Sequence, residues 1–289
     1  MPEDPLPGAA TLHTTTDDGV ELAGEQTGAG PPIVLLHGLT ATRRYVVMGS
    51  RLLERSGRRV IVYDARGHGR STPAPDAGAY GYDRLARDLL SVLDSLEIER
   101  AMLGGASMGA HTIVRFALAH PERVAGLGLI TPAYDPEAHM NGGEDEFAAW
   151  DALAQGLRLG GVEGFMAAYD FATVPRAWRA TVERVVRQRL SAHEHLEAVA
   201  DALATVPRSR PFERFEELAR IAAPTVVIAS RDEADPGHPL AAGERYARTI
   251  SGASLLVEEL GRSPLAWQGG RVAHALLDLA ERTNAYVRS

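Results

Sequence analysis

The strongest candidate for chemistry in this sequence is a serine held between two glycines. It lies in the run Gly105-Ala106-Ser107-Met108-Gly109, a G-x-S-x-G pattern that follows a short apolar run and precedes a helical pattern. A sharp strand-to-helix turn of this kind exposes the serine hydroxyl, and the small glycines avoid collisions beside it. The first N–H groups of the helix can stabilise a developing negative charge. The pattern predicts that Ser107 is a nucleophile, and the alternative is that it only makes a tight turn.

Composition narrows the other possible chemistries. The 289 residues contain no Cys and no Lys, so all 30 basic residues are Arg. A Schiff-base lysine, a thiolate nucleophile, a disulfide and a Cys-ligated metal are therefore excluded. The net charge of −8 argues against a nucleic-acid partner. The N-terminus lacks the features of a secretory signal, and the apolar runs are too short to span a bilayer. We expect a cytoplasmic protein with no membrane association and no cofactor.

The elements that must position Ser107 alternate between strand and helix patterns. A hairpin with an Asp-Gly turn is predicted over residues 11–23, and a continuous apolar strand over Ile33–Leu36. The further predicted strands are Arg59–Tyr63, Ala101–Leu103, Leu127–Ile130, Thr225–Ala229 and Leu255–Val257. The predicted helices are Val46–Ser56, Tyr82–Leu96, Met108–His120, Ala241–Ile250 and Val272–Thr283. This alternation predicts an α/β fold, with a mostly parallel, doubly wound sheet covered by helices on both faces.

One long segment interrupts the alternation. Residues 133–223 contain no β-rich run and show helical periodicity, for example over Ala177–Leu190 and His193–Ala204. We predict that this segment is a helical lid at the carboxyl edge of the sheet. Residues 1–132 and 224–289 would then form the core domain.

Four stretches together resemble the α/β-hydrolase fold superfamily, in its lid-bearing esterase and lactonase-like branch. The stretches are His37–Thr40, Asp64–Ser71, Gly105–Gly109 and Ala223–Ser230, and the resemblance extends from Thr11 to Thr283. It implies a Ser107 nucleophile and an oxyanion hole formed by the backbone N–H groups of Leu39 and Met108. It also implies an acid in the loop after Ala229.

Within that loop the acid has three candidates. The family's usual spacing selects Asp232 or Glu233, whereas the run Asp235-Pro236 followed by Pro239 matches the usual continuation after the acid. We favour Asp235, with Asp232 second. Capping of the following helix is the alternative role for these acids.

The expected base is missing. Where relatives carry the catalytic histidine, this sequence has Arg262, and a guanidinium cannot act as a general base. We hypothesise that His238, in the acid loop, pairs with Ser107 instead. The alternatives are that His238 is a surface turn residue, that the pocket performs non-hydrolytic isomerase, lyase or cyclase chemistry, or that it only binds a ligand.

Four other residues are predicted to surround a substrate: His37, Arg262, Trp267 and Trp178. A role in bracing loops is the alternative for His37, as it is for His68. The pair His193 and His195 lies in a helical pattern, in which residues two apart face away from each other, so no metal site is predicted. The favoured function is hydrolysis of a small to medium, largely apolar ester, lactone or related carbonyl compound through Ser107.

Overall fold

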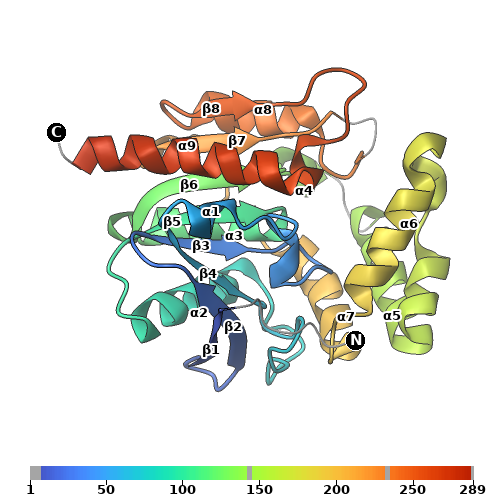
Figure 1. Cartoon of the computed structure of the whole chain (residues 1–289). Coiled ribbons are helices and arrows are strands. Elements are labelled where there is room, and N and C mark those ends of the chain that lie inside the picture. Colours follow the sequence, from blue (N-terminus) through green and yellow to red (C-terminus); the bar gives the residue numbers. More distant parts are fainter. Residues whose placement is uncertain (1–7, 142–144, 232–234, 288–289) are drawn as a thin grey trace.

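A single eight-stranded sheet organises the computed structural model, which describes residues 8–141, 145–231 and 235–287. The strand order is β1-β2-β4-β3-β5-β6-β7-β8 (Figure 1). The first two strands, β1 (Ala10–Thr15) and β2 (Glu21–Thr27), are antiparallel to their neighbours. The rest pair in parallel: β3 (Pro32–Leu36), β4 (Arg59–Tyr63), β5 (Ala101–Ala106), β6 (Val124–Ile130), β7 (Thr225–Ile228) and β8 (Ser254–Leu256). The predicted mostly parallel sheet is confirmed.

Side chains of one strand alternate between two cores. In β3, Val34 and Leu36 enter a cluster with the helices α2 (Tyr82–Ser95), α3 (Met108–Ala119) and α8 (Leu240–Thr249). Ile33 and Leu35 enter the opposite cluster with α1 (Leu52–Arg55) and α9 (Gly269–Val287). A strand has a side-chain period of two, so an unbroken apolar run is needed when both faces are covered.

One predicted helix is much shorter in the structure. Instead of a helix over residues 46–56, the chain forms a 3₁₀ turn, η1 (Arg43–Tyr45), and only one helical turn in α1. Met48 and Gly49 lie between them with φ values of 47° and 77°. Because a right-handed helix requires negative φ, these two residues end the helical path before α1 begins.

Between β6 and β7 every regular element of the described residues is helical. The elements are α4 (Pro136–Asn141), α5 (Asp145–Ala168), η3 (Phe171–Thr173), α6 (Arg176–Leu190), α7 (Leu196–Thr205), η4 (Val206–Arg208) and η5 (Phe215–Arg220). Gly161, with φ of 58°, kinks α5 so that it folds back on itself. A Cβ on Gly156 would lie 2.5 Å from the Gly164 carbonyl oxygen, so the close approach of the two arms requires glycine. In Figure 1, α5 and α6 lie to the right of the sheet, apart from its other helices.

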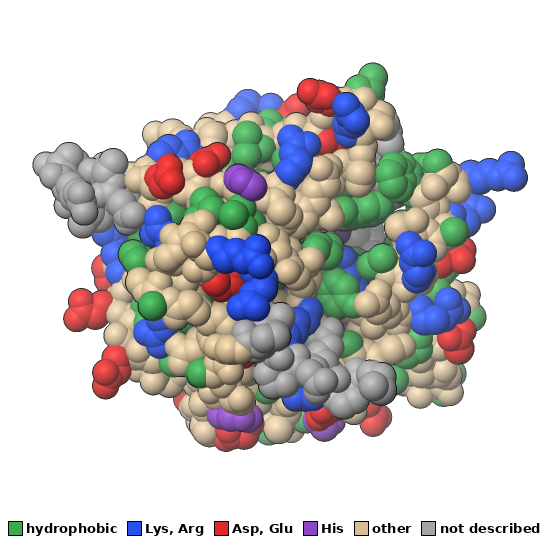
Figure 2. Space-filling view, viewed as in Figure 1, with side chains coloured by type: hydrophobic (Ala, Val, Ile, Leu, Met, Phe, Trp, Pro, Cys, Tyr) green, Lys and Arg blue, Asp and Glu red, His purple; other side chains and the backbone are tan. Residues whose placement is uncertain are grey.

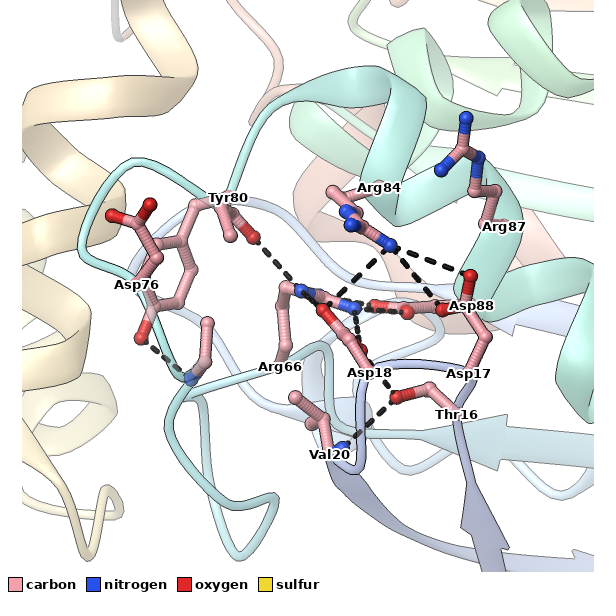
Figure 3. Close-up of polar contacts among 12 residues, drawn as sticks. Thr16, Asp17, Asp18, Val20, Arg66, Asp76, Tyr80, Arg84, Arg87 and Asp88 are labelled. Carbon is pink, nitrogen blue, oxygen red and sulfur yellow. Dashed lines mark hydrogen bonds and ion pairs between the residues drawn. The ribbon is translucent and has the colours of Figure 1, made fainter.

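A buried ion-pair network fixes the loop that follows β4. The guanidinium of Arg66 is fully buried and donates to both carboxylate oxygens of Asp88 on α2, at 2.8 and 2.6 Å. It also donates to Asp18 in the turn between β1 and β2, at 2.9 and 3.1 Å (Figure 3). The Arg66 hydrogen bond lowers the pKa of Asp18 to about 2. Two carboxylates from separate elements thus hold one loop in place.

Candidate active site

Ser107 lies at the turn between β5 and α3, in a strained backbone conformation. Its φ and ψ are 50° and −111°, outside the regions that a non-glycine residue prefers. Gly105 and Gly109 permit the turn, because a Cβ on either one would lie 2.3 Å from backbone atoms. The Ser107 N–H donates to the Ile130 carbonyl at 2.9 Å, which ties the turn to β6. The predicted strand, sharp turn and helix are all present.

His238 and Asp235 lie beside the serine. His238 Nε2 is 2.8 Å from Ser107 Oγ, and His238 Nδ1 is 2.8 Å from Asp235 Oδ2. Both residues belong to the loop between β7 and α8, where a turn with a 3.1 Å hydrogen bond from His238 N–H to the Asp235 carbonyl brings residues three apart together. With Nδ1–H donating to the carboxylate, Nε2 is free to accept the serine proton.

Charge and burial shift the pKa values of this pair in opposite directions. Burial alone would lower the pKa of His238, but the neighbouring Asp235 carboxylate raises it above its ordinary value of 6.5. Burial would raise the pKa of Asp235, but the charge and hydrogen bond of His238 lower it below 3.8. The pair therefore favours an ionised carboxylate and a histidine that readily accepts a proton.

The other candidates for acid and base have different locations. Asp232 and Glu233 lie outside the described residues. The side chain of Arg262 is 72% exposed and lies 3.8 Å from the carboxylate of Glu259. Within the described part of the chain, no hydrogen bond or ion pair joins Arg262 to Ser107, His238 or Asp235. The contact of Arg262 with a substrate therefore stays a prediction.

Sequence reasoning missed Glu258, a buried carboxylate after β8. Its Oε1 accepts a hydrogen bond from the Arg231 N–H at 2.6 Å, and its Oε2 accepts one from the Leu265 N–H at 2.9 Å. Glu258 therefore joins the start of the loop that carries Asp235 and His238 to the loop that carries Arg262. A single acid after a strand gives no sequence signal for this role, since its partners are backbone groups.

The loop after β3 lies against the serine turn. A Cβ on Gly38 would lie 3.4 Å from the Cβ of Ser107, so the next residue, Leu39, follows directly on this close approach. His37 holds the loop: its Nδ1–H donates to the Gly38 carbonyl at 2.8 Å, and its Nε2 accepts the Ala65 N–H at 2.9 Å. Both ring nitrogens of His37 are thus occupied by backbone groups, an arrangement that braces the loop.

His193 connects the helical segment to this loop. It precedes α7, which begins at Leu196, so its expected place within a helix is wrong; the chain turns after α6 before the next helix starts. The ring accepts the Gly69 N–H at Nδ1 (2.8 Å) and donates from Nε2 to the Thr40 carbonyl (3.0 Å). Burial lowers the pKa of His193 to about 4, so the histidine is neutral at neutral pH. It also contacts His68 edge to face, with ring centroids 5.4 Å apart.

The two tryptophans predicted near the substrate contact each other. Trp178 on α6 and Trp267 in η6 (Leu265–Trp267) pack edge to face with ring centroids 5.7 Å apart. They join the helical segment to the last loop of the core. Figure 2 shows hydrophobic side chains around a hollow between the core and the α5 and α6 helices. Among the described residues, no helix is long and apolar enough to cross a membrane.

The chain belongs to the alpha/beta hydrolase fold family, whose model matches residues 31–262. It is 30% identical over 258 residues to the RutD protein of Variovorax paradoxus, whose name describes a carbamate hydrolase, with 89% of this chain and 94% of that protein covered. It is 32% identical over 267 residues to a 2-hydroxy-6-oxononadienedioate/2-hydroxy-6-oxononatrienedioate hydrolase of Cupriavidus pinatubonensis, with 86% of each covered. Among solved structures, a thermophilic esterase from Thermogutta terrifontis with malate bound is 29% identical, with a TM-score of 0.74 and coverage of 95% and 98%. The protein is therefore an enzyme of this hydrolase family, acting on small substrates.

Proposed function

We propose that this protein is a serine hydrolase of small to medium carboxylic esters, lactones or related carbonyl compounds. The observation that carries the proposal is the chain of two 2.8 Å contacts from Ser107 through His238 to Asp235. It has the order of nucleophile, base and orienting acid that acyl transfer requires. The family's histidine position holds Arg262, so His238 supplies the base from the neighbouring loop.

In the proposed reaction, His238 Nε2 takes the proton of Ser107 Oγ while the oxygen attacks the substrate carbonyl. The backbone N–H groups of Leu39 and Met108 stabilise the resulting oxyanion, and a donor of this kind contributes roughly 2.7–4 kcal/mol. Protonated His238 then gives its proton to the leaving oxygen, which leaves an acyl group on Ser107. Water, deprotonated by His238, hydrolyses that acyl group and restores the serine.

The helical segment 133–223 is proposed to act as the lid over this site. Three contacts support the proposal: the hydrogen bond from His193 to Thr40, the packing of Trp178 on Trp267, and the shared apolar cluster of Leu190 and Leu39. A lid that rests on the loop beside the serine would exclude water and bind the apolar part of the substrate.

The substrate class is proposed as a carbonyl compound. The relatives' names describe hydrolases of a carbamate and of an oxo-dioate, and an esterase. Hydrolysis is better supported here than the non-hydrolytic alternative, because His238 lies at hydrogen-bond distance from the serine and Arg262 is exposed.

The test is hydrolysis of 4-nitrophenyl butyrate together with labelling by a fluorophosphonate. We expect Ser107→Ala to abolish both, and His238→Ala to slow both strongly. Arg262→Ala is the matched control, since it changes the residue at the family's histidine position, and we expect its kcat/KM to stay within about threefold of wild type, as for other exposed substitutions. Unchanged hydrolysis by Ser107→Ala would show that the serine is not the nucleophile.

A further inference from the structure

In the described part of the helical segment, Arg189 is a half-buried cation with one buried N–H group that no acceptor satisfies. Arg189, in the last turn of α6, has its Nε buried with no hydrogen-bond partner in the described structure. Its guanidinium carbon lies 5.1 Å from the centroid of the Tyr45 ring, as in a cation–π contact. No ion pair of the described residues includes Arg189. Burying an arginine N–H without an acceptor is costly, so such a group calls for an explanation.

The position of Arg189 relates it to the reaction centre. The next residue, Leu190, is fully buried in a cluster that includes Leu39, and His193 follows with its hydrogen bond to Thr40. The end of α6 therefore rests on the loop beside Ser107. The positive charge of Arg189 also helps to lower the pKa of Asp235, the carboxylate that binds His238.

Structural roles do not account for the arginine. A cation in the last turn of a helix interacts favourably with the helix dipole, but an exposed side chain does this without desolvation. Arg187, in the same turn, is half exposed and already pairs with Glu163 at 2.9 and 3.0 Å. Among the described residues, the carboxylate of Asp235 is bound to His238. An anionic ligand would supply the acceptor that Arg189 lacks.

We propose that Arg189 binds a carboxylate carried by the substrate, so that the preferred substrates are acidic esters or lactones rather than neutral ones. A guanidinium is suited to this role because it binds a carboxylate through two parallel hydrogen bonds. The inference rests on the proposed hydrolase function and specifies its substrate class: an acyl chain that is apolar apart from one ionised carboxyl group.

The test compares two substrates that differ only at the end of the acyl chain. In mono-(4-nitrophenyl) glutarate a carboxylate replaces the terminal methyl group of 4-nitrophenyl pentanoate. With spontaneous hydrolysis subtracted, we expect the wild-type kcat/KM to be about ten- to a hundredfold higher for the glutarate, the range expected for hydrogen bonds to a charged group. Arg189→Gln should remove this preference, so that the ratio of kcat/KM for the glutarate to kcat/KM for the pentanoate falls to about one. Arg187→Gln, which removes the same charge from the same helix, should retain the preference.

A second readout does not depend on the folding of a variant. Glutarate dianion should inhibit wild-type hydrolysis of the pentanoate competitively, and heptane-2,6-dione, in which neutral acetyl groups replace the two carboxylates, should not. Equal wild-type kcat/KM for the two esters, or an undiminished preference in Arg189→Gln, would overturn the role of Arg189 and leave the hydrolase proposal standing. A different result would refute the serine hydrolase function itself: the Ser107→Ala variant would still hydrolyse both esters.

Discussion

Replacing His238 by glutamine separates its role as a base from its role in the fold. The glutamine amide can still donate a hydrogen bond to Asp235, but it has no nitrogen that accepts a proton near neutral pH. The side chain of His238 is 24% exposed and glutamine is no larger than histidine, so the amide can be accommodated without repacking a closed core. We therefore expect His238→Gln to fold, with a free energy of unfolding within about 1–3 kcal/mol of wild type, the cost of one disturbed hydrogen bond.

The expected loss of activity follows from the geometry. His238 Nε2 lies 2.8 Å from Ser107 Oγ, so the proton passes directly and without a bridging water. Removing the base of a serine triad lowers kcat by about 10⁴- to 10⁶-fold. At 1.36 kcal/mol per tenfold change, this corresponds to about 5–8 kcal/mol of lost transition-state stabilisation. A histidine that only made a surface turn would give a change within about 0.5 kcal/mol.

The assay is steady-state hydrolysis of 4-nitrophenyl butyrate, with the rate of fluorophosphonate labelling as a second measure of serine reactivity. His274→Gln is the control, because His274 is an exposed histidine on α9 whose one hydrogen bond to a described residue joins it to the Gly270 carbonyl of its own helix. Circular dichroism and thermal melting establish that both variants are folded. A folded His238→Gln that keeps more than a tenth of the wild-type kcat/KM would refute the assignment of His238 as the base.

Three further predictions concern pH and packing. The pKa of His238 is raised above 6.5, so kcat/KM should fall as pH decreases through a value above 6.5. Asp235→Asn should move this acidic limb of the pH profile below 6.5 and lower kcat by about 10⁴-fold. His193 has a pKa of about 4 in the folded protein and 6.5 in the unfolded chain, so the free energy of unfolding decreases as pH falls below 6.5, by about 2 kcal/mol at pH 5. Urea titrations of wild type and His193→Gln at pH 7.5 and pH 5 should show a smaller decrease in the variant. A Cβ at position 105 would lie 2.3 Å from the backbone of Gly109, so Gly105→Ala should lower the free energy of unfolding by at least about 1–3 kcal/mol, and an unchanged urea midpoint would contradict this.

Much of the fold could be predicted because its signals are local. The apolar run of β3, the alternation of strands and helices, and the glycines around Ser107 each reflect the conformation of a few neighbouring residues. The prediction of a helix over 46–56 is wrong for a local reason that composition does not reveal, because Met48 adopts a positive φ. The prediction of a helix that includes His193 is wrong because the helical pattern of α7 continues in the sequence upstream of the first turn of the helix.

The sequence by itself determined the position of the candidate nucleophile, the sheet that presents it, and the absence of a histidine at the family's usual position. Only the tertiary structure decided which group faces Ser107. His238 is 131 residues away in the chain, and its contact depends on the arrangement of β5 and β7 on either side of β6. The same holds for Arg189, which lies between distant elements. Patterns of neighbouring residues specify the backbone conformation. Which side chains contact each other depends instead on which helices and strands pack together, and no short-range spacing in the sequence reveals that packing.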